Sequence, residues 1–233
     1  MNVFFFSLIV LLIYMTTIFG LALWLKDNSI VDVAYGLAFV LTCSSAFLVY
    51  GDGHARQWLI VSLITIWGLR LACHIFLRKQ GEGEDFRYRQ WREEWGDTFI
   101  WRSFLQIFML QGAVIFLVAL PALLVINSPG EKLGAFDGAG LLVWLIGFGF
   151  EAIGDWQLLD FKRKPENRGK IIQIGLWRYT RHPNYFGELL IYTGFLLLTI
   201  ETNLWWVPIL ILGAFVLSIW IPGMIRIDKS LSR

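Results

Sequence analysis

Charged residues are scarce in this sequence. Asp, Glu, Lys and Arg make up only 16% of its 233 residues, whereas a soluble domain normally carries about a quarter. Hydrophobic residues make up 57%. The composition therefore argues against an ordinary soluble domain and indicates a membrane protein.

Several chemical signatures are absent as well. Cys43 and Cys73 fall inside apolar stretches without C-x-x-C spacing, and the three histidines show no zinc-ligand spacing. We therefore expect no metal site. The sequence contains neither G-x-G-x-x-G after a strand nor a P-loop, so a nucleotide would be held in a non-Rossmann way.

What the sequence does contain is long apolar runs. They lie at about 3–25, 30–50, 57–77, 103–127, 138–160, 185–200 and 203–225. A membrane core about 30 Å thick requires about 20 helical residues, so the sixth run is marginal. The pattern predicts an all-α, polytopic membrane helix bundle of about seven transmembrane helices, or six without the marginal one. We expect one domain over residues 1–233.

The positive charges indicate an orientation. With seven spans, seventeen of the 20 Lys and Arg residues fall on one side of the membrane. The positive-inside rule makes that side cytoplasmic, with the N-terminus outside and the C-terminus in the cytoplasm. These loops flank helices and carry no nucleic-acid motif, so we expect no nucleic-acid partner.

Ionisable residues inside apolar spans are costly and usually face a bundle interior or a wet cavity. The second run places Asp32 and Tyr35 on one helix face, the third contains Arg70 and His74, and the fifth contains Glu151 and Asp155. One interpretation is purely structural, with Arg70 paired to Glu151. The other is a site for a charged ligand, since most of these residues lie near the predicted cytoplasmic ends.

Two cytoplasmic loops add candidate residues. The turn "GEGED" places Glu84 and Asp85 after flexible glycines, which suits a helix cap or a ligand-clasping turn. The aromatic residues that follow, from Tyr88 to Phe99, form a stripe typical of a short interfacial helix.

The second loop, residues 162–188, has the composition of a phosphate-binding site. Guanidinium groups bind phosphate bidentately and aromatic faces can stack on a ring. Its candidate contacts are Lys162, Asn167, Lys170, Arg178, Tyr179, Arg181, His182 and Tyr185. The stretch "RHPNYFGE" predicts a helix that begins at Pro183, with Asn184 and Glu188 on one face.

Three stretches carry a resemblance to a known family. "RKQGEGEDFRYRQWR", "GFGFEAIGDWQLLDFK" and "NRGKIIQIGLWRYTRHPNYFGE" resemble the bacterial branch of the steroid 5-alpha-reductase-like membrane proteins (DUF1295-type). That branch is related to sterol C14 reductases and, more distantly, to isoprenylcysteine carboxyl methyltransferases. The likeness covers roughly residues 28–225.

The resemblance implies a reductase in a bacterial inner membrane. NADPH would enter from the cytoplasm, and a flat, apolar, steroid- or isoprenoid-like lipid with a conjugated C=C bond would enter from the bilayer. The implied cofactor contacts are Glu151, Asp155, Lys162, Lys170, Tyr179, Asn184, Tyr185 and Glu188, to which the loops add Glu84 and Asp85. Asp32 falls near the acidic residue that binds the substrate carbonyl in steroid reductases. Where those enzymes place a tyrosine beside the histidine of the third span, this chain has Ile75 after His74, which leaves His74 or Tyr35 as the acid.

Two alternatives remain open. The "RHPNY" motif is shared with methyltransferases, so an S-adenosylmethionine-dependent methyltransferase of a lipid or prenyl substrate is one of them. A non-catalytic membrane protein is the other.

Overall fold

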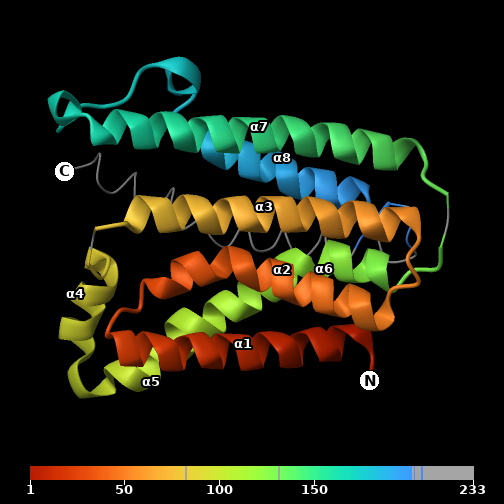
Figure 1. The fold of residues 1–233 in the computed structure, drawn as a ribbon, viewed down its shortest axis with the longest axis horizontal. Helices are drawn as coiled ribbons and strands as arrows, with labels where there is room; N and C mark the ends of the chain where they lie inside the picture. Colours follow the sequence, from red (N-terminus) through yellow and green to blue (C-terminus); the bar gives the residue numbers. More distant parts are fainter. Residues whose placement is uncertain (82, 131, 201, 203–205, 207–233) are drawn as a thin grey trace, which may run out of the picture.

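The computed structural model describes residues 1–81, 83–130, 132–200, 202 and 206. These residues form helices and connecting turns, with no β-strand among them (Figure 1). The longer helices are α1 (Val3–Leu25), α2 (Ile30–Tyr50), α3 (Ala55–Lys79), α4 (Phe86–Trp95), α6 (Leu110–Ile126), α7 (Ala135–Arg163) and α8 (Pro183–Leu197). Shorter helical turns join them: η1 (Gly96–Thr98), α5 (Phe99–Ser103), η2 (Phe104–Met109), η3 (Pro165–Asn167) and η4 (Gly175–Arg178).

Five helical segments are long and apolar enough to cross a membrane. They are Val3–Leu25, Ile30–Tyr50, Ala55–Lys79, Phe86–Ile126 and Ala135–Arg163. The helical class and the first five predicted spans are thereby confirmed. The sixth predicted span appears as α8, which has only 15 residues. The seventh, 203–225, lies outside the described residues except for Trp206, so a count of seven and the orientation of the termini stay predictions.

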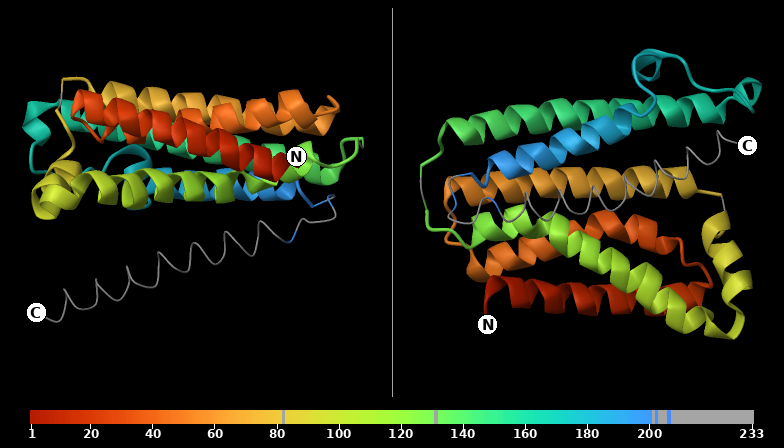
Figure 2. Two further views of the ribbon diagram at one scale, coloured as in Figure 1. Left: turned by 90° about the horizontal axis from the view of Figure 1, so that it is seen from below. Right: turned by 180° about the vertical axis from the view of Figure 1, so that it is seen from behind.

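The helices run roughly side by side, with α1 along one edge of the bundle and α7 along the opposite edge (Figure 1). α3 lies between them, and α6 and α8 lie behind α2 and α7 (Figures 1 and 2). α1, α3 and α7 end, and α2 and α8 begin, at the same end of the bundle. We call this the basic end, because the Lys- and Arg-rich loops are attached there.

α4 crosses the basic end instead of continuing the bundle, and the chain turns back through α5 and η2 into α6 (Figure 1). Asp85 caps α4, since its carboxylate accepts a hydrogen bond of 3.0 Å from the Arg87 backbone N–H. The predicted cap in "GEGED" is therefore confirmed. Tyr88 is a residue of α4, and its side chain is buried on the inner face of the helix rather than exposed on the outer face.

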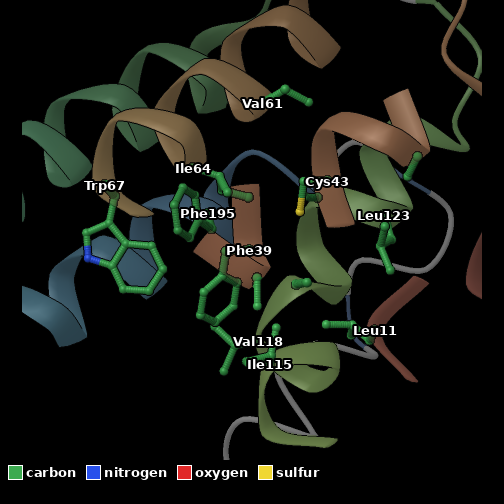
Figure 3. Close-up of a cluster of buried hydrophobic side chains, with 14 of the residues drawn as sticks. Leu11, Phe39, Cys43, Val61, Ile64, Trp67, Ile115, Val118, Leu123 and Phe195 are labelled. Carbon is green, nitrogen blue, oxygen red and sulfur yellow. The ribbon is translucent and has the colours of Figure 1, made fainter. Parts of the chain in front are cut away.

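Many large apolar side chains face outward, among them Leu48, Trp24 and Leu142. In water such exposure would be unfavourable, whereas in a bilayer these side chains contact lipid. The interior is packed with aromatic rings: Phe39 and Phe195 both contact Trp67, at ring-centroid distances of 5.1 and 6.2 Å (Figure 3).

The end of the bundle opposite the basic end is held by a buried ion pair. Arg56 at the start of α3 donates to both carboxylate oxygens of Asp137 on α7, at 2.7 and 3.0 Å. Asp137 also accepts a 2.7 Å hydrogen bond from the backbone N–H of Gly134. This pair fixes the relative height of α3 and α7, and with it the side chains they carry toward the basic end.

Candidate functional site

One guanidinium joins α3 to α7 in the basic half of the bundle. Arg70 donates from one nitrogen to Glu151 at 2.7 Å and from another to Asp155 at 2.6 Å. Glu151 and Asp155 are one turn apart on α7, so a single planar guanidinium can reach both. The predicted pairing of Arg70 with Glu151 is confirmed, and Asp155 belongs to the same cluster.

Further partners surround these two carboxylates. Trp67 donates its indole N–H to Glu151 at 3.0 Å, and Asn184 donates its amide to Asp155 at 3.1 Å. The Nε2 atom of His74 lies 3.7 Å from Asp155. Residues from α3, α7 and α8 that are far apart in sequence thus form one buried cluster.

A third carboxylate lies beside this cluster. Glu188 on α8 accepts a 2.6 Å hydrogen bond from the Tyr192 hydroxyl and lies within electrostatic range of Asp155 and Arg70. Within the described part of the chain, no Lys or Arg forms an ion pair with it. Three carboxylates therefore lie near one guanidinium, which bonds directly to two of them.

Glycines allow α8 to approach this closely. A Cβ placed on Gly147 would lie 2.6 Å from the carbonyl oxygen of Gly187, and one placed on Gly194 would lie 2.8 Å from that of Gly140. Gly140, Gly147 and Gly154 recur every seven residues, on the α7 face that packs against α8. Because small residues let helix backbones meet in a membrane, the glycine pattern sets the distance between Glu151 and Glu188.

We call the set Trp67, Arg70, His74, Glu151, Asp155, Asn184, Glu188 and Tyr192 the polar column. It extends from the basic end into the membrane-spanning part and ends at the aromatic side chains of Phe39 and Phe195, which contact Trp67 (Figure 3). Tyr35, from α2, lies within electrostatic range of Glu188, and its hydroxyl makes no hydrogen bond with the other described residues. The polar column thus combines charged groups with apolar aromatic side chains at its inner end.

Asp32 belongs to a second cluster under α4. Its carboxylate accepts hydrogen bonds from the Tyr88 hydroxyl at 2.7 Å and from Arg87 at 3.2 Å. Arg87 also donates to Asp85 at 3.0 Å. This hydrogen bond from Arg87 holds the pKa of Asp85 below its ordinary value.

Glu84 belongs to the same second cluster. It accepts a 2.7 Å hydrogen bond from Arg92 and a 2.9 Å hydrogen bond from the backbone N–H of Asn28. Nearby, burial raises the pKa of Asp27, but hydrogen bonds from Lys79 and Ser29 more than offset this, so the pKa lies below its ordinary value. Glu84, Asp85 and Asp32 therefore attach α4 to the α1–α2 turn, and their predicted contacts with cofactor or substrate would require these ion pairs to be shared.

The segment between α7 and α8 returns the chain to the column. Gln157 accepts a 3.0 Å hydrogen bond from the backbone of Leu176, and the Trp177 indole donates to the carbonyl of Gly154 at 2.9 Å. Arg178, Tyr179, Arg181, His182 and Tyr185 are exposed, and the rings of His182 and Tyr185 stack at 5.0 Å. α8 begins at Pro183 as predicted.

Lys162, Asn167 and Lys170 lie apart from these exposed side chains. They line an open groove of about 640 Å³ between the end of α7 and the loop that follows it. The Asn167 amide is already used within the chain, because it donates to the carbonyl of Phe161 at 2.9 Å.

The structure thus brings together five of the predicted site residues, Glu151, Asp155, His74, Asn184 and Glu188, and adds three that were not predicted as site residues. Arg70 was recognised only as a structural partner, whereas Trp67 and Tyr192 were missed. Each continues a helical spacing: Arg70 lies four residues before the predicted His74, Trp67 three before Arg70, and Tyr192 four after the predicted Glu188. That spacing is the signal that could have found them.

Fold and site together define an integral membrane helix bundle with a buried ionic cluster near one end. The model of the family described as "Protein of unknown function (DUF1295)" matches residues 18–226, so the chain belongs to this family. The chain is also 28% identical over 225 residues to a protein of the fission yeast Schizosaccharomyces pombe, "Uncharacterized protein C594.04c". The matched region covers 84% of this chain but only 64% of the yeast protein, which is less than two thirds of its length. No solved structure matches the chain. Neither the family description nor the name of the yeast protein states an activity. Neither supports the expectation that this protein comes from a bacterium.

Proposed function

We propose that this chain is an NADPH-dependent membrane reductase of a conjugated C=C bond in a steroid- or isoprenoid-like lipid, as its resemblance to the steroid 5-alpha-reductase-like proteins implies. The observation that carries the proposal is the polar column, which extends from the basic end of the bundle to the aromatic side chains of Phe39 and Phe195. A cofactor with a charged half and a flat ring could place its ring among the buried polar groups. An apolar substrate could approach from the bilayer side.

The donor and acceptor set of the column fits a nicotinamide carboxamide. The Asn184 side-chain oxygen is buried and has no hydrogen-bond partner among the described residues. A buried amide oxygen left unpaired is costly, so a ligand N–H that reaches it is favoured. Glu188 can accept a second N–H, because among the described residues Tyr192 alone donates to it.

When bound, the cofactor supplies the hydride equivalent for the β-carbon of the enone. The chain supplies orientation and a proton. Tyr35 is the best-placed donor of the predicted acids, since its hydroxyl makes no hydrogen bond with the described residues and interacts electrostatically with Glu188. Asp32, in contrast, is engaged by Tyr88 and Arg87. A tyrosine O–H that holds the substrate carbonyl polarises it and provides the proton that completes the saturated ketone.

Exposed cations at the basic end complete the proposed site. Arg178 and Arg181 precede α8, and Arg78 ends α3 without an ion-pair partner among the described residues. Guanidinium groups bind phosphate bidentately, which suits the phosphates of the dinucleotide. The proposal makes the basic end cytoplasmic, where this cofactor is available.

One observation favours the rival methyltransferase function. The column holds three carboxyl groups around one guanidinium among the described residues, and S-adenosylmethionine carries a positive sulfonium that carboxylates attract. Titration of the purified full chain with NADPH and with S-adenosylmethionine, followed by calorimetry, separates the two. Saturable NADPH binding supports the reductase, and saturable binding of S-adenosylmethionine alone overturns it. Lipid profiling of a deletion strain then identifies the substrate as the unsaturated species that accumulates.

A further inference from the structure

The groove at the end of α7 combines an apolar wall with a rim of cations. Leu158, Phe161 and Ile172 form its apolar part. The cations that line it are Lys162, Arg163, Lys164, Arg168 and Lys170. Its volume of about 640 Å³ is large enough for a ligand headgroup and the first part of an apolar tail.

Most of these cations are unpaired within the described part of the chain. Lys164 pairs with Asp160 at 2.7 Å, but Lys162, Arg168 and Lys170 form no ion pair there. The loop backbone is held, because the backbone N–H of Lys170 donates to Asn167 and that of Arg168 donates to Pro165. The groove is therefore a preorganised, positively charged surface.

The loop lies at the outer edge of the bundle. After α7 it folds back beside the basic end of that helix, on the side away from α1, before it reaches α8 (Figures 1 and 2). Ile171 is 83% exposed and Ile174 is 54% exposed on this loop, and Trp156 is 65% exposed on α7. Apolar and aromatic side chains beside Lys and Arg are typical of segments that lie in the headgroup layer of a membrane.

We propose that this groove binds the phosphate of an anionic phospholipid in the leaflet at the basic end. The cations hold the headgroup, while Leu158, Phe161 and Ile172 contact the first part of the acyl chains. The exposed isoleucines favour this ligand over a dinucleotide from the aqueous phase, because a lipid interface buries them and a soluble nucleotide does not. A dinucleotide phosphate is the rival occupant, since the sequence predicts Lys162, Asn167 and Lys170 as cofactor contacts.

The test uses the full chain in mild detergent, titrated with phosphatidylglycerol or phosphatidylcholine while native mass spectrometry counts the bound lipids. We expect phosphatidylglycerol to bind more tightly, and the variant Lys162→Gln/Lys170→Gln to weaken it about tenfold or more, since a surface cation contributes roughly 1 kcal/mol to anionic-lipid binding. Lys26→Gln/Arg102→Gln is the matched control. It removes two exposed cations at the basic end but outside the groove, and it should bind phosphatidylglycerol like the unchanged chain.

A second variant probes the apolar contribution. Ile171→Ser/Ile174→Ser keeps every charge and should weaken lipid binding without changing thermal stability in detergent.

Three results would overturn the proposal: equal binding of the two lipids, unchanged selectivity in Lys162→Gln/Lys170→Gln, or displacement of bound phosphatidylglycerol by NADPH. The last result would assign the groove to the cofactor. Failure of NADPH to bind anywhere would instead count against the proposed reductase and leave the lipid result intact.

Discussion

Gly147 and Gly187 face each other so closely that a Cβ on either would lie 2.6 Å from the carbonyl oxygen of the other. A Cβ on Gly187 would also lie 2.4 Å from the backbone nitrogen of Glu151. The contact therefore fixes both the spacing of α7 and α8 and the position of a column carboxylate.

Gly147→Ala should destabilise the bundle. The added methyl group meets backbone atoms that cannot rotate away, and overpacking of this kind costs about 1–3 kcal/mol. Thermal unfolding in detergent, followed by tryptophan fluorescence, measures the loss. Gly149→Ala is the matched control, because nothing lies within 4 Å of its Cβ and alanine favours a helix. Equal melting temperatures for the two variants would contradict the close packing.

Arg70→Met should destabilise the chain strongly. It leaves the buried carboxylates Glu151 and Asp155 without a cation, and removal of one partner of a buried ion pair costs about 3–5 kcal/mol. The triple variant Arg70→Met/Glu151→Gln/Asp155→Asn should recover much of the loss, because it removes the uncompensated charges. If the triple variant is no more stable than the single one, the ionic cluster is not the cause.

Glu188→Gln and Asn184→Ala should each weaken NADPH binding by about tenfold or more, as expected for the loss of a hydrogen bond in a buried polar site. Glu93→Gln is the control, since it neutralises an exposed carboxylate on α4. Calorimetric titration gives the affinities, and unchanged melting temperatures show that the variants fold. Unaltered affinity in both variants would remove the polar column from the proposed cofactor site.

Acid should destabilise the basic end of the bundle. Asp27 and Asp85 have pKa values below their ordinary values in the folded chain, so their ion pairs contribute stability at neutral pH. That contribution is present above the ordinary pKa of about 4 and is lost as the pH falls through the lower folded values. The melting temperature should therefore fall as the pH drops below about 4, and less steeply in Asp27→Asn/Asp85→Asn. Parallel pH profiles for the variant and the unchanged chain would refute this assignment.

Prediction from the sequence succeeded where local physics decides the outcome. The spans 3–25 and 30–50 match α1 and α2, because the length of an apolar run is set by the thickness of the membrane. Pro183 begins α8 and Asp85 caps α4, because both effects depend on only a few neighbouring residues.

The sequence did not show which residues distant in the chain are partners. Glu84, Asp85 and Asp32 stay predicted cofactor and substrate residues, and the structure adds that they bond to Arg92, Arg87 and Tyr88. The neighbouring sequence does not distinguish a carboxylate that binds a ligand from one that forms an ion pair with an arginine of the same chain. Tyr192 was missed for a similar reason, since a tyrosine in an apolar helix gains meaning only beside Glu188.

The sequence by itself determined that this chain is helical, that it belongs in a membrane, and that polar residues concentrate near its basic loops. These properties follow from composition, run length and charge placement. Only the tertiary structure decided that Arg70 bridges Glu151 and Asp155, and that Glu188 has no cation in the described chain. Those facts depend on how closely α3, α7 and α8 approach one another, and that distance is set by the glycines that face each other across the helix contacts.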